Sequence, residues 1–294
     1  MVKKIEYSVP EVSVIIPTYN RSAMVMRAVQ SVLAQTWRNF ECIVVDDGST
    51  DDTFSVLAEI DDRRLRVVSR ENGGVSAARN HALNISGGRF IALLDSDDEW
   101  LAEKLEKQLD FMKRGGWQIS QTEEIWIRNG RRVNQCKKHE KPEGFFWERS
   151  LEMCMVSPSC VMFTRSFLEQ IGLFDERMSA CEDYDLWIRS GLKYPVGLLR
   201  ESLTVKHGGR PDQLSNSVPC LDLLRIYSMA KMLAGGDLNV GQRESVLTEI
   251  RRKAGFYAGG CRKRGREHDA LRIEELVEKL VQGYSVDPAE FIGN

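Results

Sequence analysis

Four short apolar segments alternate with helical patterns in the N-terminal third of the chain, and this alternation constrains the fold most strongly. The apolar segments are residues 12–16, 41–45, 65–69 and 89–94. Strands that are apolar along nearly their whole length suggest a parallel sheet with helices on both faces. Between them, residues 25–33 and 77–82 repeat apolar or small side chains at helical spacing. The pattern predicts βαβ units and an α/β fold with a mostly parallel central sheet.

Polar and acidic residues follow the first, second and fourth of these strands. They occupy residues 17–21, 46–51 and 95–98. In parallel sheets of this kind, ligands bind beyond the carboxyl ends of the strands, near the point where the strand order reverses. We therefore expect the functional site at this edge of the sheet.

The middle of the chain has a mixed pattern. A helix is predicted over residues 101–114, and Asn129-Gly130 predicts a hairpin because this dipeptide favours a tight turn. Residues 166–190 predict two short helices, and residues 196–199 predict a further strand.

From Pro219 onward the pattern is helical, and the glycine pairs at residues 235–236 and 259–260 are expected to separate the helices. These helices also carry a group of basic residues. They are Arg251, Arg252, Lys253, Arg262, Lys263, Arg264 and Arg266. Such residues suit a peripheral contact with anionic lipid headgroups, and a solvated helical face is the alternative. The oligomeric state is open.

Bulk properties restrict the partners and the compartment. The chain has 294 residues and a formal net charge of −2, which argues against nucleic acid as a main partner. Its seven cysteines are scattered without a C-x-x-C pair, which indicates reduced thiols in the cytoplasm. Residues 1–7 precede no apolar stretch, so we expect no leader and no membrane anchor, and a cytoplasmic location that allows peripheral association with the inner face of the cell membrane.

The acidic run Asp95-Ser96-Asp97-Asp98 follows a strand directly, so its side chains emerge together. Clusters of carboxylates bind hard divalent cations such as Mg²⁺ or Mn²⁺, which keep open positions for phosphate oxygens. The alternative is an acidic loop that caps a helix beginning near Leu101, because carboxylates also favour helix N-termini.

Three further motifs have both a ligand-binding and a local structural interpretation. Asp47 can accept the imide proton of a uracil, whereas Ser49 and the acids after it can cap the next helix. Tyr19 and Arg21 offer a stacking face and a cation for phosphate, or belong to a simple turn. The pair Gly73-Gly74 allows a close approach of the backbone to a ligand, or makes a turn.

The order and spacing of four motifs together resemble family 2 glycosyltransferases. The motifs are VSVIIPTYNR at residues 12–21, DDGSTD at 46–51, NGGVSAARN at 72–80 and DSDD at 95–98. The resemblance covers residues 11–210. It implies the GT-A fold, a Rossmann-like fold of nucleotide-diphospho-sugar transferases, followed by a C-terminal helical extension.

The resemblance also implies an activity. We expect an inverting, metal-dependent transferase that uses a nucleotide-sugar donor, with UDP as the expected nucleotide and Mn²⁺ or Mg²⁺ as the metal. The acceptor is a hydroxyl of a glycan, lipid-linked intermediate or polysaccharide precursor of the cell envelope. Residues 1–115 form the nucleotide-sugar half of the domain, residues 116–215 the acceptor and catalytic half, and residues 216–294 the extension.

Individual roles follow from the same resemblance. The implied nucleotide-binding residues are Pro17, Thr18, Tyr19, Asn20, Arg21, Asp47, Gly74, Arg79, Asp95 and Ser96. Asp97 is the first metal ligand, with Asp95 and His207 as further ligands, and Asp98 remains as a helix cap. A structural ion pair is the alternative for Arg79. His207 lies beside two glycines, which suits a mobile loop over the donor.

The segment from Glu182 to Trp187 resembles the acidic catalytic segment of the family. Asp183 matches the general base, with Glu182 beside it in the catalytic set. Capping of a helix by Glu182 and Asp185 is the alternative, and Trp187 is expected in the core.

Three other functions compete with this one. A receiver-type signalling module also groups acids at strand ends, and a glycoside hydrolase also uses two carboxylates. A catalytically silent subunit that binds a sugar nucleotide is the third. A requirement for a nucleotide separates the transferase from the first two.

Overall fold

The computed structural model describes residues 9–210, 213, 218 and 220–293. The chain divides into two compact units. The first comprises Met1–Phe145, Met155–Glu176 and Tyr194–Arg210, and the second comprises Phe146–Cys154, Arg177–Lys193 and Pro211–Asn294. The sequence predictions for residues 1–7, for Pro219 and for a boundary at residue 216 lie outside the described residues.

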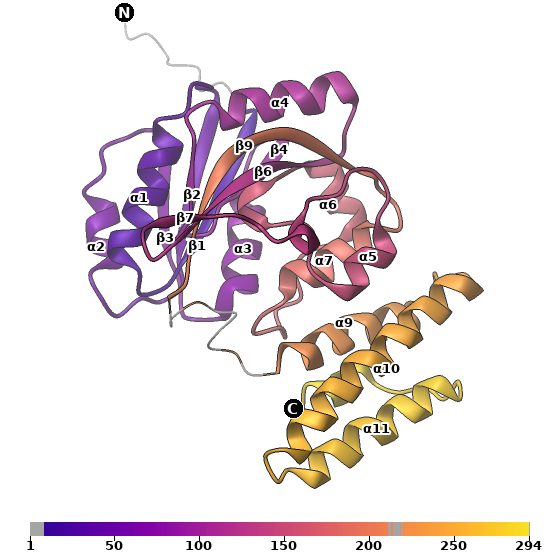
Figure 1. The fold of residues 1–294 in the computed structure, drawn as a ribbon. Coiled ribbons are helices and arrows are strands. Elements are labelled where there is room, and N and C mark those ends of the chain that lie inside the picture. The colour runs from indigo at the N-terminus through magenta and orange to yellow at the C-terminus, as the bar shows by residue number, and fades with distance from the viewer. Residues whose placement is uncertain (1–8, 211–212, 214–217, 219, 294) are drawn as a thin grey trace, which may run out of the picture. The chain divides into compact units, whose positions relative to one another are not determined.

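The first unit contains a parallel α/β layer, as the alternating pattern predicted. Its strands are β1 (Val12–Thr18), β2 (Phe40–Asp46), β3 (Leu65–Ser69) and β4 (Phe90–Leu93), and its helices are α1 (Ser22–Leu33), α2 (Thr53–Ala58) and α3 (Gly74–Ile85). β1 pairs in parallel with β2 and β4, and β2 pairs in parallel with β3. The four carboxyl ends therefore lie at one edge of the sheet (Figure 1).

Burial on both faces explains why β1, β2 and β4 are largely apolar, whereas β3, at the end of the sheet, is only partly buried. Val12, Val14 and Ile16 belong to a core that includes apolar side chains of α1 and of α4 (Lys104–Gly115). Ile15 and Ile43 are also fully buried, and α3 packs on β1 and β2. Burying one aliphatic side chain stabilises a fold by ~1.5–3 kcal/mol, so a polar residue at these positions would cost stability on either face.

The sheet continues beyond β4 with strands that change direction. The described residues form a nine-stranded sheet in the order β3-β2-β1-β4-β8-β6-β9-β5, with β7 paired to β6. The added strands are β5 (Glu99–Trp100), β6 (Ile119–Arg128), β7 (Arg131–Val133), β8 (Val161–Thr164) and β9 (Val196–Gly208), connected in part by η1 (Lys137–His139), η2 (Pro158–Cys160) and α6 (Arg165–Ile171). β8 is antiparallel to both neighbours, whereas β9 is parallel to β6. The sheet is mostly parallel, as predicted.

The hairpin predicted at Asn129-Gly130 is confirmed. β6 and β7 pair Arg128 with Arg131, and φ is 48° at Asn129 and 74° at Gly130. A two-residue turn with positive φ at both positions matches the right-handed twist of the flanking strands. The strand predicted over residues 196–199 is present and extends to Gly208.

The second unit is helical in its described part. Its elements are α5 (Trp147–Glu152), α7 (Glu182–Ser190), α9 (Leu221–Gly235), α10 (Val240–Arg262), α11 (Glu267–Val281) and η3 (Pro288–Phe291). These elements share one apolar core, in which Tyr184, Tyr227 and Ile250 are almost fully buried. Residues 146–154 and 177–193 group with the C-terminal helices in this unit. The predicted division at residues 115 and 215 stays a prediction.

One prediction about these helices is wrong. The pair Gly235-Gly236 ends α9 as expected, but Gly259 and Gly260 lie inside α10. A glycine inside a helix costs ~1 kcal/mol relative to alanine. Packing of α10 between α9 and α11, which run alongside it, outweighs that cost (Figure 1).

The longest described helix is α10, with 23 residues. Neither this helix nor any other in the described part of the chain combines the length and the apolar surface that a bilayer crossing requires.

Candidate functional site

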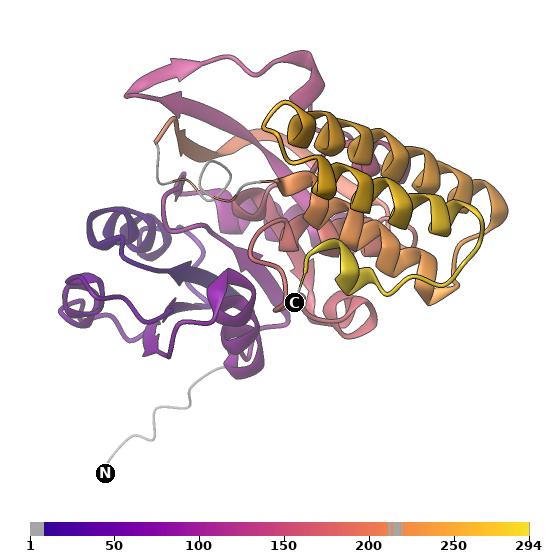
Figure 2. The ribbon, with the colours of Figure 1, turned by 90° about the horizontal axis from the view of Figure 1, so that it is seen from below.

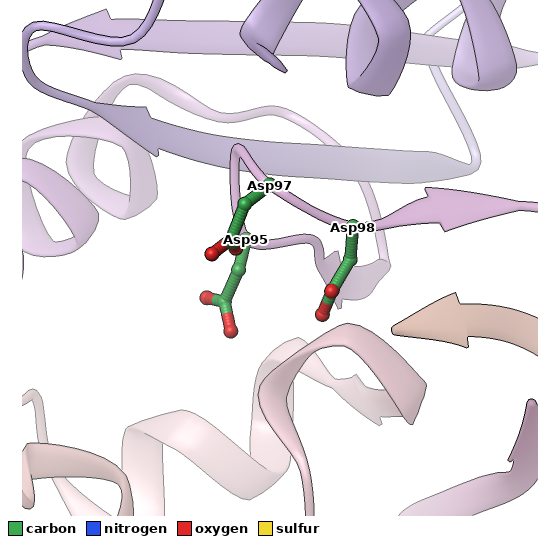
Figure 3. A group of neighbouring side chains, drawn as sticks. All are labelled: Asp95, Asp97 and Asp98. Carbon is green, nitrogen blue, oxygen red and sulfur yellow. The ribbon is translucent and has the colours of Figure 1, made fainter. Parts of the chain in front are cut away.

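Three aspartates emerge from the turn between β4 and β5. One oxygen of each of Asp95, Asp97 and Asp98 lies within 4.8 Å of the others, and Figure 3 shows the carboxylates gathered beside this turn. Ser96, between them, is buried. Because β4 is buried on both faces, the first polar side chains after it stand at the edge of the sheet. Carboxylates this close together suit a hard divalent cation.

Three arginines are paired with two of these acids. Arg21 Nη1 lies 3.1 Å from Asp97 Oδ2, and Arg210 Nη2 lies 2.5 Å from the same oxygen. Arg79 Nη2 lies 2.7 Å from Asp95 Oδ1, so the ion pair considered for Arg79 is present. Guanidinium groups also bind phosphate oxygens, and these arginines are therefore suitable partners for a diphosphate.

Asp98 is not the helix cap that the sequence predicted. It is buried, and it accepts hydrogen bonds of 2.6 Å from Ser159 Oγ and 3.1 Å from the backbone N–H of His207. The following helix begins only at Lys104, after β5. Burial raises the pKa of Asp98 to about 7, although the positive charge of Lys206 opposes this shift.

His207 lies at the end of β9 rather than on a loop. It is aligned with Ile127 of β6, and its Nε2 lies 2.9 Å from Glu99 Oε1. The aspartate cluster found among the described residues does not include it. In the structure His207 contacts the aspartate turn through its backbone N–H on Asp98, and its role as a metal ligand stays a prediction.

The loops that follow β1 and β2 are bonded to each other. The Asn20 N–H donates to Ser49 Oγ at 2.8 Å, and Asn20 Oδ1 accepts from the Thr50 N–H at 2.7 Å. Ser49 Oγ in turn donates to Asp46 at the end of β2. Tyr19 precedes Asn20 and is 47% exposed, so the loop holds an aromatic face that a base can stack on.

Asp47 has a structural role that the sequence analysis missed. Its carboxylate accepts hydrogen bonds from the backbone N–H groups of Gly73 and Gly74, at 3.1 and 2.7 Å, at the start of α3. Gly74 has a φ of 88°, a conformation that favours glycine. Pro17 and Thr18 end β1 and are buried, and the Asp47 N–H donates to Thr18 O at 2.9 Å. A nucleobase that bonds to Asp47 would therefore use a carboxylate that also orients the start of α3.

Glu182 and Asp183 lie in the second unit, in the first turn of α7. Asp183 Oδ1 accepts from the Tyr184 N–H at 2.7 Å, and its Oδ2 accepts from Cys154 Sγ at 3.3 Å. Glu182 is buried. The role of Asp183 as a base continues to rest on the family resemblance.

Asp185 has a different environment from Asp183. It is fully buried, and its two carboxylate oxygens lie 2.9 Å from Arg189 Nε and 2.9 Å from Lys231 Nζ. Trp187 is in the core, as expected. Asp185 is therefore part of an internal ion-pair network rather than a helix cap.

Sequence reasoning also missed Ser159, which lies in η2. Its Oγ accepts from the Asp95 N–H at 3.1 Å and donates to Asp98 Oδ2, so it orients the aspartate turn from both ends. A serine in a connecting segment gives no sequence signal of such a role, because its partners lie more than 60 residues away.

Known proteins are similar to this chain in sequence and in fold. A family model described as glycosyl transferase family 2 matches residues 13–172. A glucosyltransferase of Escherichia coli, UDP-Glc:alpha-D-GlcNAc-diphosphoundecaprenol beta-1,3-glucosyltransferase WfgD, is 35% identical over 178 residues, which cover 60% of this chain and 68% of that protein. The crystal structure of Staphylococcus aureus TarS 1-349 in complex with UDP-GlcNAc superposes with a TM-score of 0.74 at 21% identity, covering 96% of this chain and 89% of that TarS 1-349 chain.

Some relatives are much longer than this chain. An uncharacterised glycosyltransferase of Rickettsia felis is 36% identical over 202 residues, which cover 66% of this chain but 32% of that protein. The chain spans about a third of the length of the first such curated relatives.

Proposed function

Because the chain belongs to glycosyltransferase family 2 and has the GT-A fold, we propose that it transfers a sugar from a nucleotide-diphosphate donor to an acceptor hydroxyl. We take UDP as the nucleotide, and a glycan, a lipid-linked intermediate or a polysaccharide precursor as the acceptor. WfgD is named for a UDP-glucose donor and a diphosphoundecaprenol-linked acceptor, which supports this choice. The reaction would take place in the cytoplasm or at the inner face of the cell membrane.

The observation that carries the proposal is the aspartate turn with its arginines. Asp95 and Asp97 stand at the carboxyl edge of a parallel sheet, where nucleotides bind in folds of this class. Arg21, Arg79 and Arg210 surround them and supply the positive charge that a diphosphate requires.

The same turn fits a divalent metal. Three carboxylates within 4.8 Å form an oxygen donor set, which suits Mn²⁺ or Mg²⁺. Asp97 and Asp95 would hold the ion, and Asp98, which is bonded to Ser159, would shape the turn. When bound, the ion supplies charge neutralisation for the diphosphate leaving group.

Transfer with inversion at the anomeric carbon requires one general base. We assign this role to Asp183, which takes the proton of the acceptor hydroxyl while that oxygen bonds to the anomeric carbon and the bond from this carbon to the diphosphate breaks. The hydrogen bond from the Tyr184 N–H to Asp183 Oδ1 would fix the carboxylate, and Asp183 Oδ2 would take the proton. The Cys154 thiol, which donates to Oδ2 in this structure, would then turn away from that oxygen.

The test combines a donor screen with one substitution. A thermal-shift screen of nucleotide sugars with Mn²⁺ or Mg²⁺ identifies the donor, and transfer or donor hydrolysis is then measured for the wild type and Asp183→Asn. We expect transfer to fall by about 10²–10⁴-fold, the usual contribution of a general base, with UDP and Mn²⁺ binding retained. Asp237→Asn makes the same change at an exposed site of the second unit and should be active. Full activity of Asp183→Asn would contradict the assignment of the base.

The alternative function is a silent subunit that binds a sugar nucleotide. It predicts that the wild type binds the donor but neither transfers nor hydrolyses it. The family assignment leaves a receiver-type signalling module without support.

A further inference from the structure

A cationic segment of the first unit has no role in the proposed reaction. We define the basic hairpin as residues 126–139, which include the end of β6, β7 and η1. It contains five basic residues, Arg128, Arg131, Arg132, Lys137 and Lys138, and no Asp or Glu. All five are exposed, although the whole chain has a net charge of −2.

Two arginines of the basic hairpin lie next to each other. Arg128 and Arg131 are directly opposite in the β6–β7 ladder. Like charges in this position destabilise a hairpin. Within the described part of the chain, no carboxylate lies within salt-bridge distance of Arg128, Arg131, Arg132 or Lys137. An anion from outside the protein would therefore relieve a repulsion that the fold itself leaves uncompensated.

Trp126 adds an amphipathic ring to the same segment. It lies two residues before Arg128 on the same strand, so both side chains project from one face of the hairpin. The Arg128 guanidinium lies 5.5 Å from the ring centroid, and the His139 ring lies 5.2 Å away on the η1 side. Tryptophan favours the boundary between headgroups and acyl chains, where one side of the ring is wet.

The C-terminal helices are also basic in sequence, but several of their basic residues form salt bridges with carboxylates. Arg252 and Lys253 both pair with Glu249, at 2.6 and 2.8 Å. Arg262 pairs with two glutamates, and Arg266 pairs with Asp269 at 2.6 Å. Much of the positive charge that suggested a membrane contact there is thus neutralised within the second unit.

We propose that the basic hairpin docks on an anionic bilayer surface. Its cations extend from β6 through β7 to η1, which matches a plane of lipid headgroups better than one small anion. β6 and β7 project beyond the rest of the sheet (Figure 2). The docking is independent of the proposed function, because it requires neither a donor nor an acceptor.

The experiment is co-sedimentation of the full chain with vesicles of phosphatidylcholine alone or mixed with phosphatidylglycerol. We expect binding to the anionic vesicles only, with a loss at high salt. The variant Arg131→Gln/Arg132→Gln/Lys137→Gln should lower the partition coefficient by about a hundredfold, because each of the three cations near such a surface contributes about fivefold. The charge-retaining variant Arg131→Lys/Arg132→Lys should bind like the wild type.

A matched control separates position from total charge. Arg251→Gln/Lys263→Gln/Arg264→Gln removes the same three charges from exposed positions of the second unit and should leave binding unchanged. Equal binding by the hairpin variant, a loss only in the control, or equal binding of the wild type to neutral vesicles would each overturn the proposal. Tighter binding to an RNA oligonucleotide than to the vesicles would also overturn it. Circular dichroism verifies that every variant is folded.

Discussion

The two arginines on Asp97 should compete with a divalent cation for the same carboxylate oxygen. Arg21 and Arg210 both contact Asp97 Oδ2, although one belongs to the segment after β1 and the other follows β9. A metal ion that binds Asp97 through this oxygen must displace them. We therefore predict that Arg21→Gln and Arg210→Gln increase the affinity for Mn²⁺ when no nucleotide is present.

The magnitude follows from the exposure of the pairs. The side chains of Arg21 and Arg210 are 20% and 26% exposed, and that of Asp97 is 13% exposed. Solvent screens pairs of this kind, so each contributes about 0.7 kcal/mol. Removing both amounts to about 1.4 kcal/mol, which is a factor of about ten in the dissociation constant of Mn²⁺. Each single variant should show a factor of about three.

The assay is a titration of free Mn²⁺ by electron paramagnetic resonance, with and without UDP. Without UDP the double variant should bind Mn²⁺ more tightly than the wild type. With UDP the order should reverse, because the same guanidinium groups are then lost from the diphosphate. Arg114→Gln is the control, because Arg114 is 81% exposed and pairs only with Asp110 in the described structure. Unchanged or weaker Mn²⁺ binding by the double variant without UDP would refute the competition.

Three further predictions concern stability. Burial lowers the pKa of Lys104 to about 7. Between pH about 7 and pH about 10 the unfolded chain therefore binds one more proton than the folded chain, and the free energy of unfolding rises with pH. Lys104→Met should abolish this rise in urea unfolding, and a rise that persists in the variant would contradict the argument. A Cβ at Gly88 would lie 2.5 Å from a backbone nitrogen of β1, so Gly88→Ala should lower the unfolding free energy by about 1–3 kcal/mol, whereas Gly235→Ala, with open space around its Cβ, should not. Ser159→Ala removes a hydrogen bond to buried Asp98 and should cost about 1–3 kcal/mol in thermal unfolding; an unchanged melting temperature would contradict this role.

The amino-acid sequence determined the features that depend on neighbours along the chain. The apolar runs predicted strands buried on both faces, and the polar residues after them predicted the edge where Asp95 and Asp97 stand. Asn129 and Gly130 predicted their hairpin because a two-residue turn requires positive φ at both positions. The four motifs were sufficient to identify the family, which the match over residues 13–172 confirms.

Only the tertiary structure decided which partners the functional side chains have. Asp97 meets arginines 76 and 113 positions away in the sequence, and no local pattern encodes such a distance. Asp98 became a buried acid under Ser159 instead of a helix cap, because β5 separates it from α4. Gly259 and Gly260 stayed helical because the packing of a whole helix outweighs a local preference of ~1 kcal/mol per glycine. Local chemistry selects the candidates, and long-range packing decides which charges face each other.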